Sequence, residues 1–180
     1  DEIAKLAKAG SRISLDPVLA ADRLRMIVED NGGNVVEAAD PARLPRATKN
    51  EAELAGSRAA HRRDGAAVVR FLCWLDAQLP GSIDEITAVT RLEEARHRVG
   101  EETQRALKDV SFETISGSGP NGAIIHYRVS RASNRKLGKD ELLMLDSGAQ
   151  YQNGPTDITR TIAIGTPSDE MRERFTPPKT

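Results

Sequence analysis

The fold of this chain is decided by the stretch from residue 142 to residue 164, which reads LLMLDSGAQYQNGPTDITRTIAI. It begins with four apolar residues, and its last seven residues, 158–164, are rich in isoleucine and threonine. Both segments are typical of β-strands. The dipeptide Asn153-Gly154 lies between them and favours the tight turn of a β-hairpin. The stretch therefore predicts two antiparallel strands that are joined at this turn.

Each of the two predicted strands carries an aspartate at the end nearer to the turn. Asp146 ends the first strand and Asp157 begins the second, so the hairpin would bring their carboxylates alongside each other. Two like charges this close destabilise each other, which predicts either a shared proton or a cation between them. Oxygen ligands favour Mn²⁺ or Mg²⁺, and Zn²⁺ or Co²⁺ if an imidazole joins them. The alternative is that both are ordinary aspartates of a strand end and a turn.

The residues between 48 and 109 are predicted to form two helices. In the first, one buried face is marked by apolar residues at helical spacing: Val68, Leu72, Leu75 and Leu79. The second helix shows the same spacing at Ile86, Val89, Leu92 and Val99. The charged residues between these positions are interpreted as solvated faces, and His61 and His97 as surface histidines. Strands are predicted to follow at 111–115 and 123–127. Residues 48–180 are therefore predicted to form an α+β layer, in which two helices precede an antiparallel sheet.

Residues 1–47 have a different character. A helix is predicted over 18–28 and a short strand at Val35-Val36, with turn signals around both. This segment resembles the tail of an α/β unit more than a domain with its own core. The boundary between the two parts falls near residues 45–50.

The segment 116–127 reads SGSGPNGAIIHY and contains the glycine spacing of a dinucleotide-binding fingerprint. That fingerprint requires the loop to open a helix, whereas here an apolar β-type run follows and Pro120 lies inside the loop. We interpret the segment as a tight loop between two strands, whose glycines allow a ligand or another backbone to approach closely. His126 ends the run. It is either a hydrogen-bonded core residue or, if the carboxylate pair holds a metal, a catalytic group.

Composition excludes several classes of protein. The 180 residues include 26 basic and 27 acidic side chains, a net charge of −1 that excludes an electrostatic nucleic-acid binder. No apolar run approaches the roughly 18 residues of a membrane span, and the first residues lack the apolar block of a secretory signal. Cys73 is the single cysteine, which fits a reducing, cytoplasmic compartment, and its apolar neighbours predict that it is buried.

Three runs of residues, 114–127, 145–151 and 156–161, resemble the Xaa-Pro aminopeptidase family (aminopeptidase P) in its long, three-domain form. The likeness is dense from about residue 111 to residue 175 and looser over residues 13–44. It implies the pita-bread fold of the metal-dependent aminopeptidases, creatinases and prolidases, in which two related α/β halves enclose a dinuclear metal site. Residues 1–47 would be the C-terminal part of the middle domain, and residues 48–180 the N-terminal half of the catalytic domain.

The resemblance also implies roles for single residues. Asp146 would be the first carboxylate ligand and Asp157 the ligand shared by two metal ions, usually Mn²⁺, with Zn²⁺ or Co²⁺ as alternatives. His126 matches the family histidine that contacts the substrate near the scissile bond, and Thr159 is a candidate for orienting the ligands. The implied reaction is removal of the N-terminal residue from peptides with proline at the second position, by a metal-activated water. The full-length protein would be a homodimer.

Two other functions stay open at this point. One is a prolidase of the same fold, which acts on dipeptides. The other is a non-catalytic binding or scaffold module that retains the half-fold without the chemistry.

The resemblance also shows what the chain lacks. Two aspartates are too few ligands for two metal ions, and the family adds a histidine and two glutamates from the second half of the fold. No histidine follows His126, and Glu170 and Glu173 lie in a predicted exposed turn of helix. Pro155 stands where the family usually has threonine, and Pro177-Pro178 where it continues a helix. We therefore expect a piece of a longer enzyme that is inactive alone.

Overall fold

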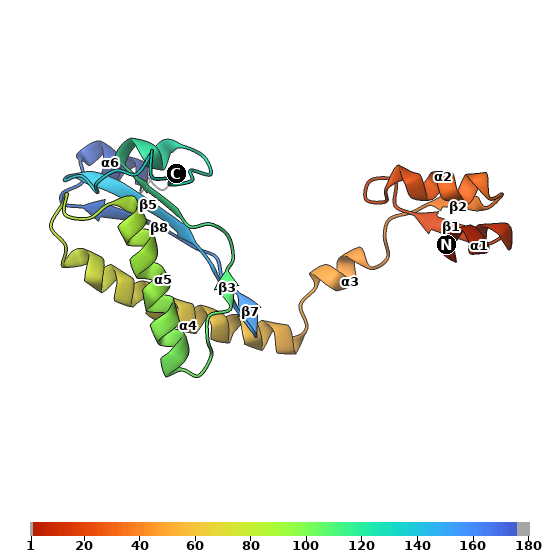
Figure 1. Cartoon of the computed structure of the whole chain (residues 1–180), viewed down its shortest axis with the longest axis horizontal. Coiled ribbons are helices and arrows are strands. Elements are labelled where there is room, and N and C mark those ends of the chain that lie inside the picture. Colours follow the sequence, from red (N-terminus) through yellow and green to blue (C-terminus); the bar gives the residue numbers. More distant parts are fainter. Residues whose placement is uncertain (1, 176–180) are drawn as a thin grey trace. The chain divides into compact units, whose positions relative to one another are not determined.

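Two helices lie against one face of a small antiparallel sheet in the part of the molecule that carries the hairpin (Figure 1). The computed structural model describes residues 2–175. It divides into two compact units, Asp1–Asn50 and Glu51–Thr180.

The N-terminal unit contains a pair of parallel strands and three helices. Its elements are α1 (Glu2–Lys8), β1 (Arg12–Leu15), α2 (Asp22–Asp30), β2 (Asn34–Glu37) and α3 (Arg43–Ala47). The strand predicted at Val35-Val36 is confirmed, and it pairs in parallel with β1. The helix predicted over 18–28 begins only at Asp22, because the Asp16 carboxylate accepts the backbone N–H groups of Val18 and Leu19 and holds a turn there.

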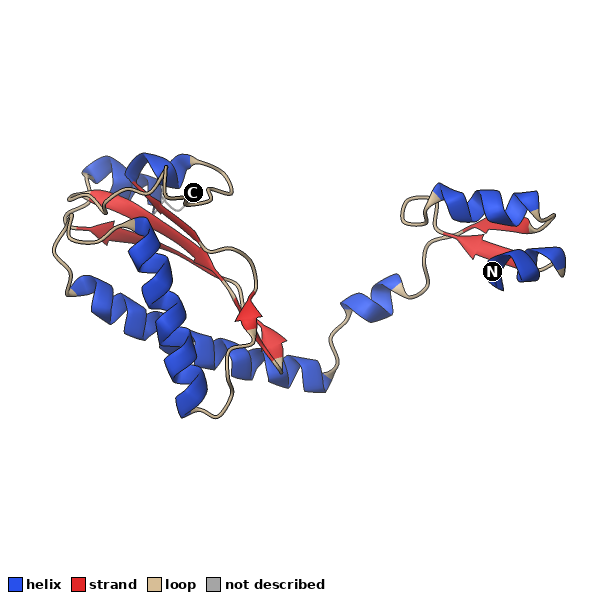
Figure 2. Ribbon diagram, in the orientation of Figure 1, coloured by secondary structure: helices blue, strands red, loops and turns tan. Residues whose placement is uncertain are grey.

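The second unit begins with the two predicted helices, α4 (Glu51–Asp76) and α5 (Glu85–Glu102). Their apolar faces meet the sheet in one core, formed by Val68, Phe71, Leu75, Ala88, Leu92, Leu137, Leu143 and Leu145. The buried face predicted for the first helix is partly wrong. Leu79 is 78% exposed because α4 ends at Asp76, and Cys73, which we expected to be buried, is exposed. Figure 2 shows both helices on the same side of the strands.

The predicted hairpin is confirmed. It runs through two small sheets, of strand order β4-β5-β8 and β3-β6-β7. In the part of the hairpin far from the turn, Leu143 pairs with Ile162 and Asp146 with Thr159. Next to the turn, Tyr151 pairs with Gly154. The turn therefore consists of Gln152 and Asn153, one residue earlier than predicted. The strands are β3 (Asp109–Val110), β4 (Ile115–Ser118), β5 (Glu141–Ser147), β6 (Ala149–Tyr151), β7 (Gly154–Pro155) and β8 (Ile158–Ile164).

The strand predicted over 111–115 is wrong for most of its length. Only Ile115 belongs to a strand, and residues 111–114 connect β3 to β4. The reason is that Ser111 is anchored on the hairpin: its N–H donates to the carbonyl oxygen of Gly148, and its hydroxyl to that of Thr156, at 3.0 and 2.9 Å. The chain passes from one sheet to the other at this point.

The strand predicted over 123–127 is absent. The chain forms a 3₁₀-helix, η1 (Gly119–Ala123), and then a turn in which the N–H of Tyr127 donates to the carbonyl oxygen of Ile124. The phenol of Tyr127 is buried and donates to Glu85 Oε2 at 2.9 Å. Burying this ring requires the chain to turn back on itself, and that requirement outweighs the β propensity of the isoleucines.

The described part of the chain ends with α6 (Asp169–Phe175), on which Glu170 and Glu173 are exposed as predicted. The N–H of Met171 donates to the hydroxyl of Ser168 at 3.2 Å, which caps this helix. The Pro177-Pro178 pair lies outside the described residues. Across residues 2–175, no helix has both the length and the apolar character that a membrane crossing needs.

Candidate metal centre

The hairpin brings Asp146, Asp157 and Thr159 together on the sheet face that points away from α4 and α5. Asp146 is paired with Thr159 across the ladder, and the Thr159 hydroxyl donates to Asp146 Oδ1 at 2.8 Å. Asp157 lies directly before β8, two residues from Thr159, and the Thr156 side chain between β7 and Asp157 is turned to the helix side, where it bonds Asp64. The alternation of the strand, continued by one residue, puts Asp157 on the same face as Thr159. The neighbouring Leu145 belongs to the helix-covered core, so the alternation of the strand turns Asp146 to the open face.

The two carboxylates differ in their surroundings. Asp146 is half-buried, whereas Asp157 is exposed and makes no hydrogen bond or ion pair within residues 2–175. Oxygen donors of this kind suit a divalent cation, and a hydroxyl that orients one of them is a common feature of metal sites. Within the described residues, no group of three or more His, Cys, Asp or Glu side chains is placed to hold a metal ion. The two carboxylates are oxygen donors that would fit part of a metal site.

His126 lies on the turn that follows η1. Its side chain is exposed, its backbone has a φ of 52°, and it makes no hydrogen bond to either aspartate. The adjacent Ile125 is 86% exposed. The alternative in which His126 is a hydrogen-bonded core residue is therefore wrong, and its imidazole is accessible to a ligand.

Glu85, at the start of α5, holds the loop that carries His126. Its carboxylate is fully buried and accepts hydrogen bonds from the N–H of Ser118 at 2.7 Å, the side-chain amide of Asn121 at 3.0 Å and the phenol of Tyr127 at 2.9 Å. Burial raises the pKa of Tyr127. These bonds fix both ends of the segment 118–127.

The glycines of this loop serve a close approach of two backbone segments, as predicted. A Cβ on Gly117 would lie 2.8 Å from the backbone nitrogen of Gly122, which is closer than real Cβ contacts come. A side chain at Gly117 would therefore push the two segments apart.

A buried ion pair lies on the helix side of the hairpin. Arg96 of α5 binds Asp64 of α4 through two hydrogen bonds, from Nε to Oδ1 at 2.7 Å and from Nη2 to Oδ2 at 3.1 Å, and both side chains are fully buried. Tyr151 lies beside them. Burial and, to a smaller extent, the negative charge of Asp64 raise the pKa of Tyr151 to about 12.

Sequence reasoning missed these buried charges because it assigned the charged positions of both helices to solvent. A signal was present. Asp64 falls in register with the buried positions Ala60, Ala67, Val68, Phe71 and Leu75, and Arg96 and Glu85 with Ala88, Leu92 and Val99. A charged residue within an apolar helical stripe indicates a buried, partnered charge.

Glu85→Gln is expected to lower the free energy of unfolding by about 1–3 kcal/mol, because the side-chain NH₂ group replaces one buried acceptor oxygen by a donor, and the donors that face it are left unpaired. Urea unfolding of this chain, followed by the fluorescence of its single tryptophan, Trp74, measures the change. Glu101→Gln, at an exposed position of the same helix, is the control and should stay within about 0.5 kcal/mol of the wild type. Equal effects of the two substitutions would contradict the role given to Glu85.

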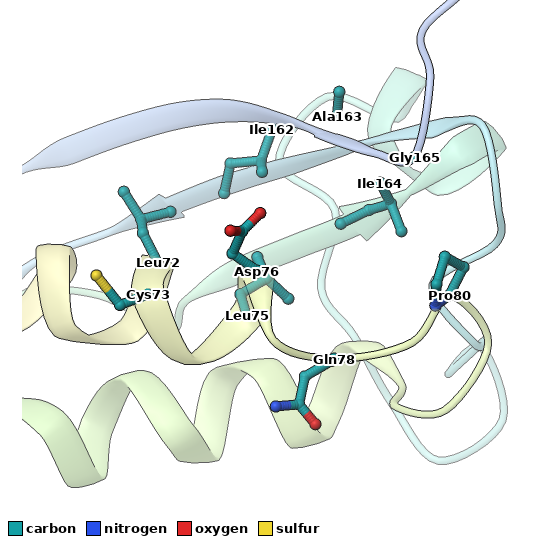
Figure 3. A pocket seen from close by; sticks show the side chains of 10 residues that line it. All are labelled: Leu72, Cys73, Leu75, Asp76, Gln78, Pro80, Ile162, Ala163, Ile164 and Gly165. Carbon is teal, nitrogen blue, oxygen red and sulfur yellow. The ribbon is translucent and has the colours of Figure 1, made fainter.

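A cavity of about 610 Å³ lies elsewhere in the unit, between the end of α4 and the end of β8 (Figure 3). Cys73, Asp76 and Ile164 are among the residues that line it. Its wall on β8 is at the opposite end of the strand from Asp157 and Thr159, and none of the predicted site residues lines it. The cavity is separate from the carboxylate pair.

The family model and the similar proteins that match this chain all belong to one family of metallopeptidases. The model of metallopeptidase family M24 matches residues 55–177. Xaa-Pro aminopeptidase 2 of Sus scrofa is 46% identical over 137 residues, which are 76% of this chain and 20% of that protein. A probable Xaa-Pro aminopeptidase P of Aspergillus clavatus is 41% identical over 146 residues, 79% of this chain and 21% of that protein. The chain thus spans about a fifth of the length of these curated relatives.

A solved structure agrees with these relatives. The X-prolyl aminopeptidase from Caenorhabditis elegans, described as a cytosolic enzyme with a di-nuclear active site, superposes with a TM-score of 0.75 at 30% identity. The superposition covers 94% of this chain and 28% of that one. The likeness confirms the predicted α+β fold of the pita-bread type.

Proposed function

This chain belongs to metallopeptidase family M24, and from that membership we propose that it is part of an Xaa-Pro aminopeptidase. Such an enzyme releases the N-terminal residue from peptides with proline at the second position. The observation that carries the proposal is the hairpin face on which Asp146, hydrogen-bonded to Thr159, lies with Asp157. The names of the curated relatives support the choice of substrate.

Asp146 and Asp157 would hold two divalent ions, with Asp157 as the shared ligand. We propose Mn²⁺, with Zn²⁺ or Co²⁺ as alternatives; the di-nuclear site named for the C. elegans enzyme supports the number of ions. When bound, the ions supply an activated water and polarise the peptide carbonyl. Thr159 would hold one oxygen of Asp146 in place. His126, whose ring is exposed, would contact the peptide beside the bond that is cut.

The rest of the site would come from a longer chain, which we call the parent chain. Two carboxylates are fewer ligands than two metal ions take, and the family resemblance adds a histidine and two glutamates. In the parent chain, residues 1–47 would end the middle domain and residues 48–180 would form the first half of the catalytic domain. We further propose a homodimer in the cytoplasm, the compartment named for the C. elegans enzyme, without a nucleic-acid partner.

The test is a peptidase assay of the purified parent chain with Mn²⁺. We expect it to cleave an Xaa-Pro-Xaa tripeptide, to leave the matched Xaa-Ala-Xaa tripeptide largely intact, and to lose activity when the metal is removed by chelation. Faster cleavage of an Xaa-Pro dipeptide than of the tripeptide would identify a prolidase instead. No cleavage of any Xaa-Pro peptide would contradict the proposal and favour a scaffold role.

A further inference from the structure

We propose that the buried Asp64–Arg96 pair is a positioning device for the metal site: it fixes the spacing of Asp146 and Asp157 by holding the residue next to each. This inference rests on the function proposed above. The pair joins α4 to α5 and lies on the helix side of the hairpin, with both side chains fully buried.

The pair is hydrogen-bonded to both strands of the hairpin, at the residues next to the two aspartates; Asp64 also accepts the phenol of Tyr151 on the first strand, at 3.3 Å. Arg96 Nη2 donates to the hydroxyl of Ser147 at 3.0 Å, and Ser147 directly follows Asp146. Asp64 Oδ2 accepts the hydroxyl of Thr156 at 2.6 Å, and Thr156 directly precedes Asp157. Arg96 of α5 is therefore linked to the strand that carries Asp146, and Asp64 of α4 to the strand that leads to Asp157.

The attachment coincides with the point where the ladder leaves one sheet and enters the other. Ser147 pairs with Ile158 at the end of the first sheet, and Gln150 with Pro155 in the next. Between them, the N–H of Ala149 donates to the hydroxyl of Thr156 at 3.0 Å. A Cβ on Gly148 would clash with the carbonyl oxygen of Thr156. The two strands are therefore in close contact at the residues that lie next to the two aspartates.

Stability alone is a weak reason for this arrangement. Replacing a buried ion pair by apolar side chains of similar volume is often neutral or stabilising, because the desolvation of two charges offsets their attraction. Hydrogen bonds from a planar guanidinium and a carboxylate are, in contrast, strongly directional. The pair supplies defined directions to Ser147 and Thr156, which apolar packing would not supply.

The need for such a device follows from the charges. Asp146 and Asp157 repel each other when no cation lies between them, and Asp157 has no hydrogen bond or ion pair of its own within residues 2–175. A support that holds the backbone on both sides would keep the carboxylates near each other before the metal binds. Loosening that support should weaken metal binding while leaving both carboxylates in the chain.

The experiment measures the Mn²⁺ affinity of the metal-free parent chain by titration calorimetry. Thr156→Val removes the hydroxyl that joins Asp64 to the second strand, and with it the acceptor of the Ala149 N–H, but preserves the size and branching of the side chain, as well as the ion pair. We expect about tenfold weaker Mn²⁺ binding, in the range for residues that orient metal ligands. Thr156→Ser keeps the hydroxyl and should restore most of the affinity. Thr161→Val, on the exposed part of β8, is the matched control, since its hydroxyl makes no hydrogen bond within residues 2–175.

Circular dichroism at the titration temperature establishes that each variant is folded. If Thr156→Val binds Mn²⁺ as tightly as the wild type and Thr161→Val, the pair serves the fold alone and this inference is overturned, while the proposed function stands. Equal losses in Thr156→Val and Thr156→Ser would overturn it as well, because the hydroxyl would then not be the cause. A wild-type parent chain that binds no Mn²⁺ would overturn the proposed function and this inference together.

Discussion

Asp157→Asn is expected to lower the Mn²⁺-dependent rate of Xaa-Pro peptide cleavage by the parent chain at least about 100-fold, because loss of a group that merely orients a metal ligand already costs about 10–100-fold. Asparagine has the size of aspartate but carries no charge, so it leaves the hairpin turn intact. The exposure of Asp157, together with its lack of a partner within the described residues, means that the substitution breaks no structural bond there. The loss should therefore appear in catalysis and metal binding and not in stability.

The matched control is Asp30→Asn, at an exposed carboxylate that ends α2. It changes the net charge by the same amount and should leave the rate unchanged. Steady-state kinetics over a range of Mn²⁺ concentrations separates weaker metal binding, which added metal restores, from a loss of the reaction itself. A rate for Asp157→Asn close to that of Asp30→Asn would contradict the role of Asp157.

Arg96→Met is expected to lower the free energy of unfolding by about 3–5 kcal/mol, because it leaves the carboxylate of Asp64 buried without its cation. Methionine fills much of the volume of the arginine stem. The decrease in the free energy of unfolding is therefore caused by the missing charge and hydrogen bonds more than by a cavity. Urea unfolding followed by Trp74 fluorescence measures the change. In the same variant, Ser147 loses the donor that Arg96 Nη2 provides.

A second ion pair between the same two helices provides the control. Arg70 of α4 and Glu102 of α5 approach to 2.6 Å, but both side chains are about half exposed, at 49% and 48%. Exposed pairs contribute about 0–1 kcal/mol, so Arg70→Met should have a small effect. If Arg96→Met destabilised the chain no more than Arg70→Met, the Asp64–Arg96 pair would not be buried as described.

The hairpin and its aspartates could be predicted because they depend on local features. An apolar run, a turn dipeptide and a second strand determine an antiparallel pairing, and the pairing then sets which residues lie opposite each other. The register of the hairpin therefore places Asp146 and Asp157 near each other in the ladder, although it does not fix how precisely their carboxylates are held. The observed turn lies one residue before the predicted one, because Gly154 is the first residue of β7 and not part of the turn.

The wrong strands show where local pattern is insufficient. Residues 111–114 and 123–127 have strand-like sequences, yet their conformation is set by distant partners, the hairpin for Ser111 and Glu85 for Tyr127. No alternation within five residues reveals a bond to a residue more than 40 positions away. The buried charges of α4 and α5 escape prediction for a different reason: apolar residues alone define the helical periodicity, although Asp64 and Arg96 lie in the same buried stripes.

The most direct test of the account is anomalous X-ray diffraction, at the manganese absorption edge, from crystals of the parent chain grown with Mn²⁺. We predict two adjacent manganese peaks, both bound by the carboxylate of Asp157 and one of them also by Asp146. Crystals that contain manganese elsewhere, or none bound to either aspartate, would contradict the claim that this hairpin carries half of a dinuclear metal site.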